Sequence, residues 1–366
     1  MRTIGPGNAN RWRRACAALA LVLTAGALVP AGSLAAPSVR FQLAIGNASF
    51  EGTADPDLVF TVVVTGADGT VKDRETITAD SDGYWRSSVG ARGNIAAGDR
   101  FRARVGSVTV GSLRVPQLTV QGDRVTDRVR GRAPAGSTVS VRLITCPTGL
   151  ADIGTCDVGM DVDRPVDAKG RWSWNAASEE PRGGDRIYAT WSSGGSTVLV
   201  PGLFPFLSVR IGTSRLEGAI LPGSRSRVSL ERSGRRVATA RALGYGTVGF
   251  IWARFRNAAG RNVAVAAGDI VRAPFAGDAE LEVSSVSISV TGGTSAASGV
   301  CLPGGTGALA WGSGETRSYR GLTIGVDGTW DAELVPAPPA GATFELSCAT
   351  QAGDVVRLVG TVPPAP

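Results

Sequence analysis

The sequence contains no histidine among its 366 residues, and only two of its 38 basic residues, Lys72 and Lys169, are lysines. The lack of histidine removes the usual general base, the commonest metal ligand and every Ser-His or Cys-His arrangement. The scarcity of lysine leaves few candidates for a Ser-Lys dyad, and neither lysine lies near a serine in a strained-turn motif. We therefore expect no catalytic activity, no cofactor and no metal site.

A pair of carboxylates can hydrolyse glycosides without histidine, so one enzyme class remains open. The acidic residues fall mostly in turns or on the exposed side of predicted strands, where solvated charges belong. A carboxylate-based glycosidase is therefore the least favoured function for this chain.

Long hydrophobic runs are also missing, apart from one near the N-terminus. A short arginine-rich segment precedes an apolar run over residues 15–29, and Ser33 and Ala35 supply small residues where a signal peptidase would read them. About fifteen apolar residues fall short of the roughly twenty needed to span a bilayer. We expect residues 1–35 to be a signal peptide, the mature chain to have no transmembrane span, and the protein to be secreted and associated with the cell surface.

The excess of positive charge is smaller in the mature chain than in the whole sequence. The net charge is +7, but Arg2, Arg11, Arg13 and Arg14 belong to the expected signal peptide. Without them 34 basic residues face 31 acidic ones, which leaves a net charge of +3. Because the chain is expected to be exported and carries no recognition motif, we expect no nucleic-acid partner.

A unit of about 80–90 residues recurs four times after the signal peptide. Its first mark is an early glycine, and these glycines are 79, 87 and 81 residues apart: Gly52, Gly131, Gly218 and Gly299. Its second mark is a Gly-Asp pair, and the pairs begin 86 and 84 residues apart at Gly98, Gly184 and Gly268. Two sets of marks with similar spacing indicate tandem modules.

A Gly-x-Trp segment lies between the two marks and ends at Trp85, Trp172 and Trp330. The third copy is degraded to Gly249-Phe250-Ile251-Trp252, and the fourth copy replaces Gly-Asp by Gly341-Ala342. These departures show that the copies have diverged.

Each module contains about seven short runs separated by Gly, Pro, Asn or Asp, and no long amphipathic helical pattern is present. In the first run Val39, Phe41 and Leu43 alternate with polar or small residues, which is typical of a half-buried strand. We predict an all-β fold of four tandem two-sheet sandwiches. The predicted modules cover residues 37–117, 118–205, 206–283 and 284–366.

Four cysteines remain beyond the signal peptide: Cys146, Cys156, Cys301 and Cys348. An even number in an exported chain favours disulfides. Four cysteines allow three pairings, and the modular layout favours Cys146–Cys156 and Cys301–Cys348 because each pair then lies within one module. Metal ligation is the alternative, but the chain offers neither a CxxC spacing nor a histidine.

Three local patterns carry a resemblance to a known family: Pro-Gly before a Val-x-Val-type strand, Asp-x-x-Gly-x-Trp in the middle, and Gly-Asp before a final strand. With these patterns the modules resemble bacterial Ig-like modules, which are similar in outline to fibronectin type III and carboxypeptidase-regulatory-like domains and occur in tandem on exported proteins. The resemblance covers most of the mature chain. It implies a sandwich fold and an adhesive, spacer or accessory role, and its motifs carry no activity.

Trp172 and Trp174 are two residues apart and therefore share one face of their strand. If that face is inward, both belong to the core, which is the favoured interpretation. If it is outward, they form a platform on which a pyranose ring can stack.

Charge is distributed unevenly, with a net charge of zero in each of the first two modules, +6 in the third and −3 in the fourth. In the third module five arginines cluster around a predicted hairpin with its turn at Ser233-Gly234: Arg225, Arg227, Arg232, Arg235 and Arg236. Such a patch can hold an anionic wall polymer, a phospholipid surface or an acidic protein. A soluble arginine-rich hairpin is the plainer interpretation.

Two acidic segments, Asp80-Ser81-Asp82-Gly83 and Asp161-Val162-Asp163, contain oxygen ligands of the kind that Ca²⁺ takes. No further ligand follows at the spacing of an EF-hand, and Asp-Gly is ordinary turn chemistry. We therefore expect plain turns at both places.

These features together favour a non-catalytic exported Ig-like protein with a structural, spacer or adhesive role at the cell envelope. Its partner would be a cell-envelope polymer or a surface protein. The alternative is a carbohydrate-binding accessory protein that uses exposed aromatic residues.

Overall fold

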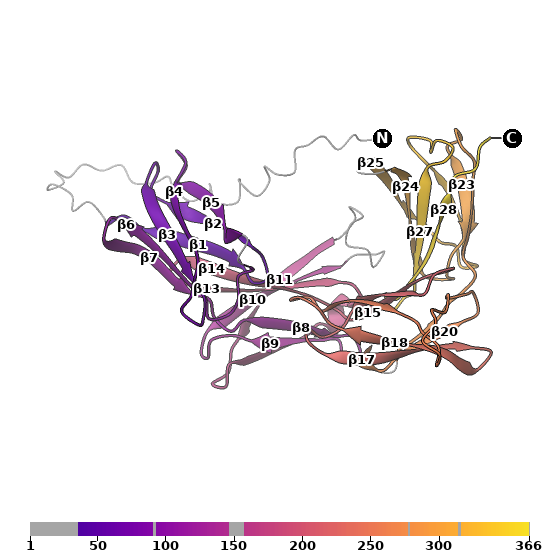
Figure 1. Ribbon diagram of the computed structural model, residues 1–366, viewed down its shortest axis with the longest axis horizontal. Coiled ribbons are helices and arrows are strands. Elements are labelled where there is room, and N and C mark those ends of the chain that lie inside the picture. The colour runs from indigo at the N-terminus through magenta and orange to yellow at the C-terminus, as the bar shows by residue number, and fades with distance from the viewer. Residues whose placement is uncertain (1–35, 91–92, 146–156, 277–278, 314–315, 366) are drawn as a thin grey trace. The chain divides into compact units, whose positions relative to one another are not determined.

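The computed structural model describes residues 36–90, 93–145, 157–276, 279–313 and 316–365 (Figure 1). The expected signal peptide and the predicted Cys146–Cys156 bridge lie outside the described residues. Within them the regular structure is almost entirely strand, with two three-residue 3-10 helices, η3 (Ala177–Glu179) and η4 (Pro274–Ala276). In this part of the chain no helix has the length and apolar character that crossing a bilayer requires. The all-β prediction is confirmed.

The strands of the described residues fall into four groups of seven in chain order. The first group contains β1 (Val39–Ala44), β2 (Ser49–Ala54), β3 (Val59–Thr65), β4 (Val71–Thr78), β5 (Tyr84–Ser88), β6 (Arg100–Val105) and β7 (Val108–Arg114). The second contains β8 (Thr119–Asp123), β9 (Arg128–Arg132), β10 (Thr138–Thr145), β11 (Asp157–Pro165), β12 (Arg171–Asn175), β13 (Arg186–Ser193) and β14 (Ser196–Leu203).

The other two groups follow in the same manner. The third contains β15 (Phe206–Arg210), β16 (Arg215–Ala219), β17 (Arg225–Arg232), β18 (Arg235–Leu243), β19 (Phe250–Arg254), β20 (Ile270–Ala273) and β21 (Ala279–Glu282). The fourth contains β22 (Ser287–Val290), β23 (Ala296–Val300), β24 (Thr306–Ser313), β25 (Thr316–Leu322), β26 (Thr329–Glu333), β27 (Thr343–Ala349) and β28 (Val355–Thr361).

Strand order repeats in all four groups. The first, second and fifth strands form one antiparallel sheet, such as β1-β2-β5, and the fourth, third, sixth and seventh strands form the other, such as β4-β3-β6-β7. Strands such as β1 and β6 alternate buried and exposed residues, because one face of each sheet meets the opposite sheet and the other meets solvent. Each group is therefore a two-sheet sandwich.

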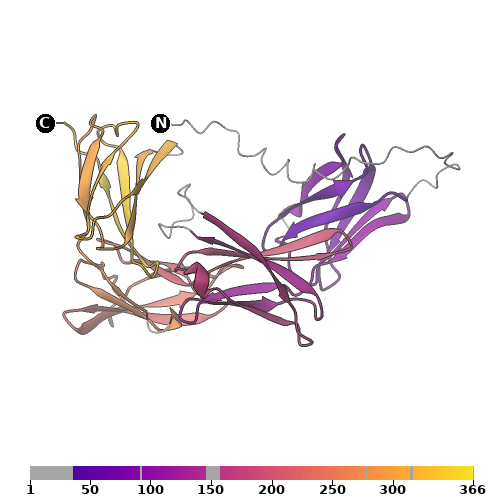
Figure 2. The ribbon, with the colours of Figure 1, turned by 180° about the vertical axis from the view of Figure 1, so that it is seen from behind.

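Parallel pairing joins the four groups two by two. β1 lies parallel to β14, with Gln42 opposite Thr197 and Ala44 opposite Leu199. This contact merges a three-stranded and a four-stranded sheet into one seven-stranded sheet, in the order β11-β10-β13-β14-β1-β2-β5. Figures 1 and 2 show the β13–β14 hairpin running alongside the first strands of the chain.

The second half of the chain repeats this junction. β15 lies parallel to β28, with Val209 opposite Val356, and gives a second seven-stranded sheet in the order β19-β16-β15-β28-β27-β24-β25. We call residues 37–205 and residues 206–366 the first and second paired units. The sheets cross the predicted boundaries at 117 and 283, so the four-module division remains a prediction about the strand groups.

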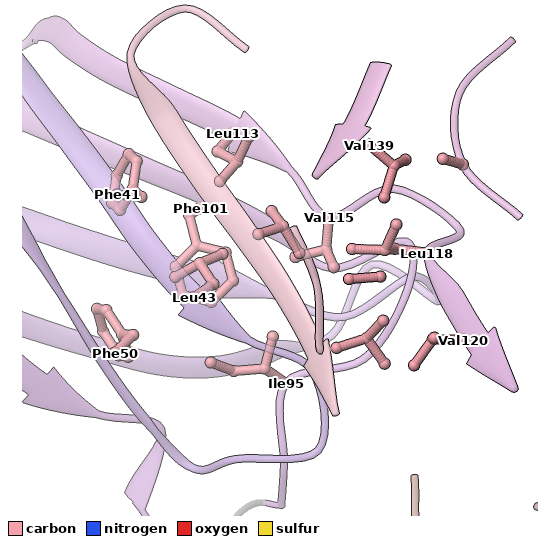
Figure 3. Packing of buried hydrophobic residues seen from close by; sticks show 14 of the residues in the cluster. Phe41, Leu43, Phe50, Ile95, Phe101, Leu113, Val115, Leu118, Val120 and Val139 are labelled. Atoms are coloured by element: carbon pink, nitrogen blue, oxygen red, sulfur yellow. The ribbon is translucent and has the colours of Figure 1, made fainter. Parts of the chain in front are cut away.

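Buried side chains follow the same pairing. One hydrophobic cluster draws its members from Val39 to Phe204, and a second draws them from Leu207 to Val362. Val115 of the first strand group and Leu118 and Val120 of the second belong to the same cluster and are labelled in Figure 3, so the cluster extends across the predicted boundary. The core thus unites two strand groups in each paired unit.

At three of the four early glycines of the repeat, a methyl group would collide with a backbone carbonyl oxygen and with a tryptophan of the neighbouring strand. Gly52, Gly131 and Gly299 lie directly opposite Trp85, Trp172 and Trp330 on antiparallel strands. A methyl group on these glycines would lie 2.5, 2.6 and 2.8 Å from the respective indole rings, closer than any side chain can approach. The Gly-x-Trp mark and the early glycine are therefore two halves of one packing contact.

The Gly-Asp mark places an aspartate inside the protein. Asp99, Asp185 and Asp269 are each at most 1% exposed, and each accepts a hydrogen bond from the backbone N–H three residues earlier at 2.7–2.9 Å. Asp99 also pairs with Lys72 at 2.7 Å. A buried carboxylate is costly unless it is paired and hydrogen-bonded. The aspartate of each Gly-Asp mark therefore holds the turn before the sixth strand of its group in place.

The predicted Cys301–Cys348 disulfide is present and lies in the core of the fourth strand group, with the two Cα atoms 5.5 Å apart. Cys301 follows β23 and Cys348 lies on β27, so the bond links the two sheets of this group.

Candidate functional site

In the third strand group isoleucine takes the place of the core tryptophan. Trp85, Trp172 and Trp330 are buried on β5, β12 and β26, whereas Ile251 occupies the corresponding place on β19 and is 1% exposed. The tryptophan follows one residue later, at position 252. Because successive side chains of a strand point to opposite faces, this shift turns Trp252 outward, where 63% of it is exposed.

Two further aromatic side chains accompany Trp252. Phe250 lies on the same face of β19, and its ring centroid is 5.7 Å from that of Trp252 at an interplanar angle of 39°. Tyr245 is held by its backbone N–H, which donates to the carbonyl oxygen of Phe250 at 2.8 Å, and its ring lies 6.5 Å from Trp252 at 33°. Tyr245 and Phe250 are 52% and 40% exposed. We call these three residues the aromatic patch.

Trp252 also lines a cavity of about 690 Å³ whose charged side chains are mostly arginines. β16 and β19 supply Arg215 and Arg254, which lie directly opposite each other in the sheet. β18 supplies Arg241, and Arg256 follows β19. We call this the arginine cavity; it shares Trp252 with the aromatic patch.

Backbone pairing positions the arginine cavity at the edge between two sheets. β18 belongs to the outer sheet of the third group and β19 to the seven-stranded sheet. Thr239 and Arg256 exchange two backbone hydrogen bonds of 2.9 Å, which tie β18 to the segment after β19. Side chains from β16 and β19 of one sheet and from β18 of the other therefore line the same cavity.

The cavity is electrostatically positive. Its one acidic lining residue, Glu217, already pairs with Arg357 at 3.4 Å, and Arg357 contacts Glu345 at 3.3 Å. None of the four cavity arginines forms an ion pair with another described residue. The arrangement can therefore hold an anionic group beside an apolar ring.

The five arginines highlighted by the sequence lie around the hairpin of β17 and β18. Its turn is at Ser233-Gly234, where both residues have positive φ. Arg225 lies opposite Leu243 and Arg227 opposite Arg241, so Arg227 adjoins the arginine cavity. Arg235 and Arg236 are exposed near the turn.

Arg232 has a structural partner. Its guanidinium donates two hydrogen bonds to the buried Asp269, at 2.7 and 2.8 Å, and a third to the carbonyl oxygen of Ala264. The hydrogen bond with Asp269 raises the pKa of Arg232. Arg232 is therefore engaged in holding the Gly-Asp turn.

Trp172 and Trp174 do not form a platform. They are 4% and 7% exposed and belong to the first core cluster. The guanidinium of Arg164 lies 5.9 Å from the centroid of Trp174. The platform interpretation of these two residues is wrong because their face of β12 is turned inward against the opposite sheet.

Of the two acidic segments only the first is a turn: Asp161-Val162-Asp163 lies within β11, so the expectation of a turn there is wrong. Asp80 Oδ1 accepts hydrogen bonds from the backbone N–H groups of Asp82 and Tyr84, as a turn requires. Asp161 accepts from Arg142 at 2.7 Å, and this hydrogen bond lowers the pKa of Asp161. Within the described ranges no group of three metal-ligating residues is close enough to hold a metal ion.

No protein-family model and no curated protein matches the chain. Among solved structures, a tetra-tandem repeat from the extending region of a large adhesion protein is 14% identical, covers 89% of this chain and 99% of its own, and has a TM-score of 0.18. The BSP domain of a biofilm-associated protein is 9% identical, with coverages of 92% and 100% and a TM-score of 0.19.

Alpha-2-macroglobulin of E. coli is 11% identical, with a TM-score of 0.18, and this chain spans only 29% of its length. At such identities and TM-scores these likenesses say nothing about what the present chain binds or does.

Proposed function

We propose that the protein is a non-catalytic, exported protein of the Ig-like type that acts as a load-bearing spacer or adhesive element at the cell envelope. It would contact an envelope polymer or a surface protein. The expected signal peptide and the tandem sandwiches support this proposal.

The observation that carries the proposal is the parallel pairing of the first and last strands of each paired unit. Tension applied to the two ends of the first unit pulls β1 and β14 past each other along their length. β15 and β28 are loaded in the same way. Hydrogen bonds between such strands are strained together instead of one after another, so the unit resists extension until several of them fail at once.

Single-molecule force spectroscopy on residues 37–366, held at both ends, tests the load-bearing role. We expect two dominant rupture events, each releasing one paired unit, because each unit is closed by one parallel strand pair. Four weak events, one for each strand group, would contradict the proposal.

Surface location is tested on intact producing cells with a protease that does not enter them. We expect the chain to be cleaved from the outside, and cells lacking it to attach less well to surfaces. Recovery of the intact chain only from inside the cells would contradict an envelope role.

A second candidate function, carbohydrate binding, is favoured by one observation, the exposure of Trp252 beside Tyr245 and Phe250. Flat aromatic rings can stack against the apolar face of a pyranose. This function is compatible with the first, since an adhesive element needs a ligand.

A further inference from the structure

We propose that the aromatic patch and the arginine cavity of the third strand group together bind an acidic polysaccharide. A pyranose ring would lie on Trp252, and the carboxylate or sulfate groups of the chain would be held by Arg215, Arg241, Arg254 and Arg256. The proposal specifies the carbohydrate-binding candidate above, and it is independent of the load-bearing role.

The aromatic patch is one half of the argument. Two rings on one face of β19 and the neighbouring ring of Tyr245 expose apolar area that folding leaves in contact with water, whereas Trp85, Trp172, Trp311 and Trp330 are all buried. Exposed aromatic clusters of this kind mark interaction sites. Because Ile251 fills the core position, Trp252 is not part of the hydrophobic core cluster of its sandwich.

The arginine cavity is the other half. Arg215 lies opposite Arg254, and Arg227 lies opposite Arg241. Like charges directly opposite each other on neighbouring strands destabilise a sheet. A bound anion would relieve this repulsion, and guanidinium groups hold carboxylates and sulfates with two hydrogen bonds each.

Opposed arginines also occur elsewhere in the chain, as with Arg100 and Arg114 on β6 and β7. Among the residues that the structure describes, no trio of exposed aromatic rings accompanies that pair. The combination of the two features is therefore what distinguishes the third strand group.

The geometry favours a chain over a single sugar. One ring stacked on Trp252 leaves the rings of Tyr245 and Phe250 and the four cavity arginines free to contact further units of the same chain. The cavity volume of about 690 Å³ lies within the range of ligand sites, which is roughly 300–1,000 Å³. Arg227 and Arg225 extend the positive charge along β17.

Single-stranded nucleic acid uses the same residue types, namely arginine and stacked aromatic rings. The expected export of the chain favours a polysaccharide, because acidic glycans are characteristic of cell surfaces. Nucleic acid is accordingly the main competing outcome of the test.

The test measures binding of residues 37–366 to immobilised polygalacturonate and chondroitin sulfate, with neutral dextran, poly-glutamate and a 20-nucleotide poly-dT as comparison probes. We expect the two acidic glycans to bind at least 10-fold more tightly than dextran or poly-glutamate. Dextran lacks the charge and poly-glutamate lacks the pyranose ring. Tighter binding of poly-dT, equal binding of poly-glutamate, or no glycan binding would overturn the proposal.

Substitutions in the aromatic patch and in the arginine cavity show whether the glycan binds at this site. We expect Trp252→Ala to weaken acidic-glycan binding at least 10-fold at every salt concentration, and Arg241→Gln with Arg254→Gln to weaken it and reduce its salt dependence. The matched controls are Tyr319→Ala, another exposed aromatic of the second seven-stranded sheet, and Arg102→Gln on β6. Unchanged binding by Trp252→Ala, or equal losses in the controls, would overturn the proposal. Thermal unfolding of each variant shows whether it is folded.

Discussion

At the scale of single residues, one position in a strand decides between core and surface. Trp172 and Trp252 both follow a Gly-x turn mark, but Trp252 comes one residue later and points to the other face. The altered Gly-x-Trp pattern in the sequence was therefore the signal for the exposed site. The buried face of a strand is fixed by the opposite sheet, so the shift by one residue does not by itself place Trp252 on the surface.

The contact between Gly52 and Trp85 yields a stability prediction. We expect Gly52→Ala to destabilise the first paired unit by about 1–3 kcal/mol, since a methyl group there would collide with the carbonyl oxygen of Arg40 and with the indole of Trp85. Chemical denaturation of the wild-type protein and of Gly52→Ala measures the change in the free energy of unfolding. Gly321→Ala is the matched control, because a methyl group at Gly321 meets nothing within 4 Å. Equal stabilities for the two variants would contradict the packing argument.

Asp167 yields a prediction about pH. Its carboxylate accepts backbone hydrogen bonds from Arg171 and Lys169, with the bond from Arg171 the stronger influence, and these lower its pKa below the ordinary value of 3.8. A lowered folded-state pKa means that the stabilisation is present above the unfolded-state pKa and is lost as the pH falls through the folded-state value.

Asp167→Asn keeps an acceptor oxygen but removes the charge. We expect the melting-temperature difference between wild type and this variant to be largest near neutral pH and to shrink below about pH 4. A difference that stays constant down to pH 2 would show that the carboxylate charge contributes nothing to the turn.

At the scale of secondary structure, the strands and turns were accessible from the sequence but their pairing between modules was not. Period-two alternation indicated strands such as residues 39–45, and Gly-Asp or Asp-Gly indicated turns. The parallel contact between β1 and β14 covers three residue pairs more than 150 positions apart. Neither composition nor local pattern distinguishes such a strand from any other half-buried edge, so the sequence predicted separate modules.

The junction in the first unit depends on a buried hydroxyl. Ser196 at the start of β14 is 5% exposed and its Oγ accepts the backbone N–H of Phe41 on β1 at 3.1 Å. We expect Ser196→Ala to cost about 1–3 kcal/mol, because it leaves that buried N–H without a partner. Amide hydrogen exchange at Phe41 should accelerate in the variant, while exchange at Val62 on β3 stays unchanged. Equal protection of Phe41 in both proteins would contradict the role of Ser196.

At the scale of the whole chain, the four strand groups form two paired units. The sequence predicted four tandem sandwiches, and the structure unites their buried residues into two clusters. The Cys301–Cys348 bond was predictable because both cysteines fall in one copy of the repeat.

The disulfide belongs to the second unit alone. Cys301 and Cys348 are 47 positions apart, so the chain-entropy model gives a stabilisation of about 4 kcal/mol. We expect the double variant Cys301→Ser, Cys348→Ser to lower the melting temperature of the second unit more than that of the first in differential scanning calorimetry, because, among the described residues, only the ion pair between Arg124 and Asp354 and nearby backbone hydrogen bonds can pass the effect on. Equal shifts of every transition would contradict the division of the chain into two units.

The central claim is that adjoining strand groups share one sheet and one core. The most direct measurement compares the unfolding free energy of residues 37–117 alone with that of residues 37–205. We expect the shorter fragment to be much less stable, or unfolded, and its Ile45 amide, which donates to Leu199 in the pair, to lose its protection from exchange. Equal unfolding free energies and equal protection of Ile45 in the two fragments would contradict the claim.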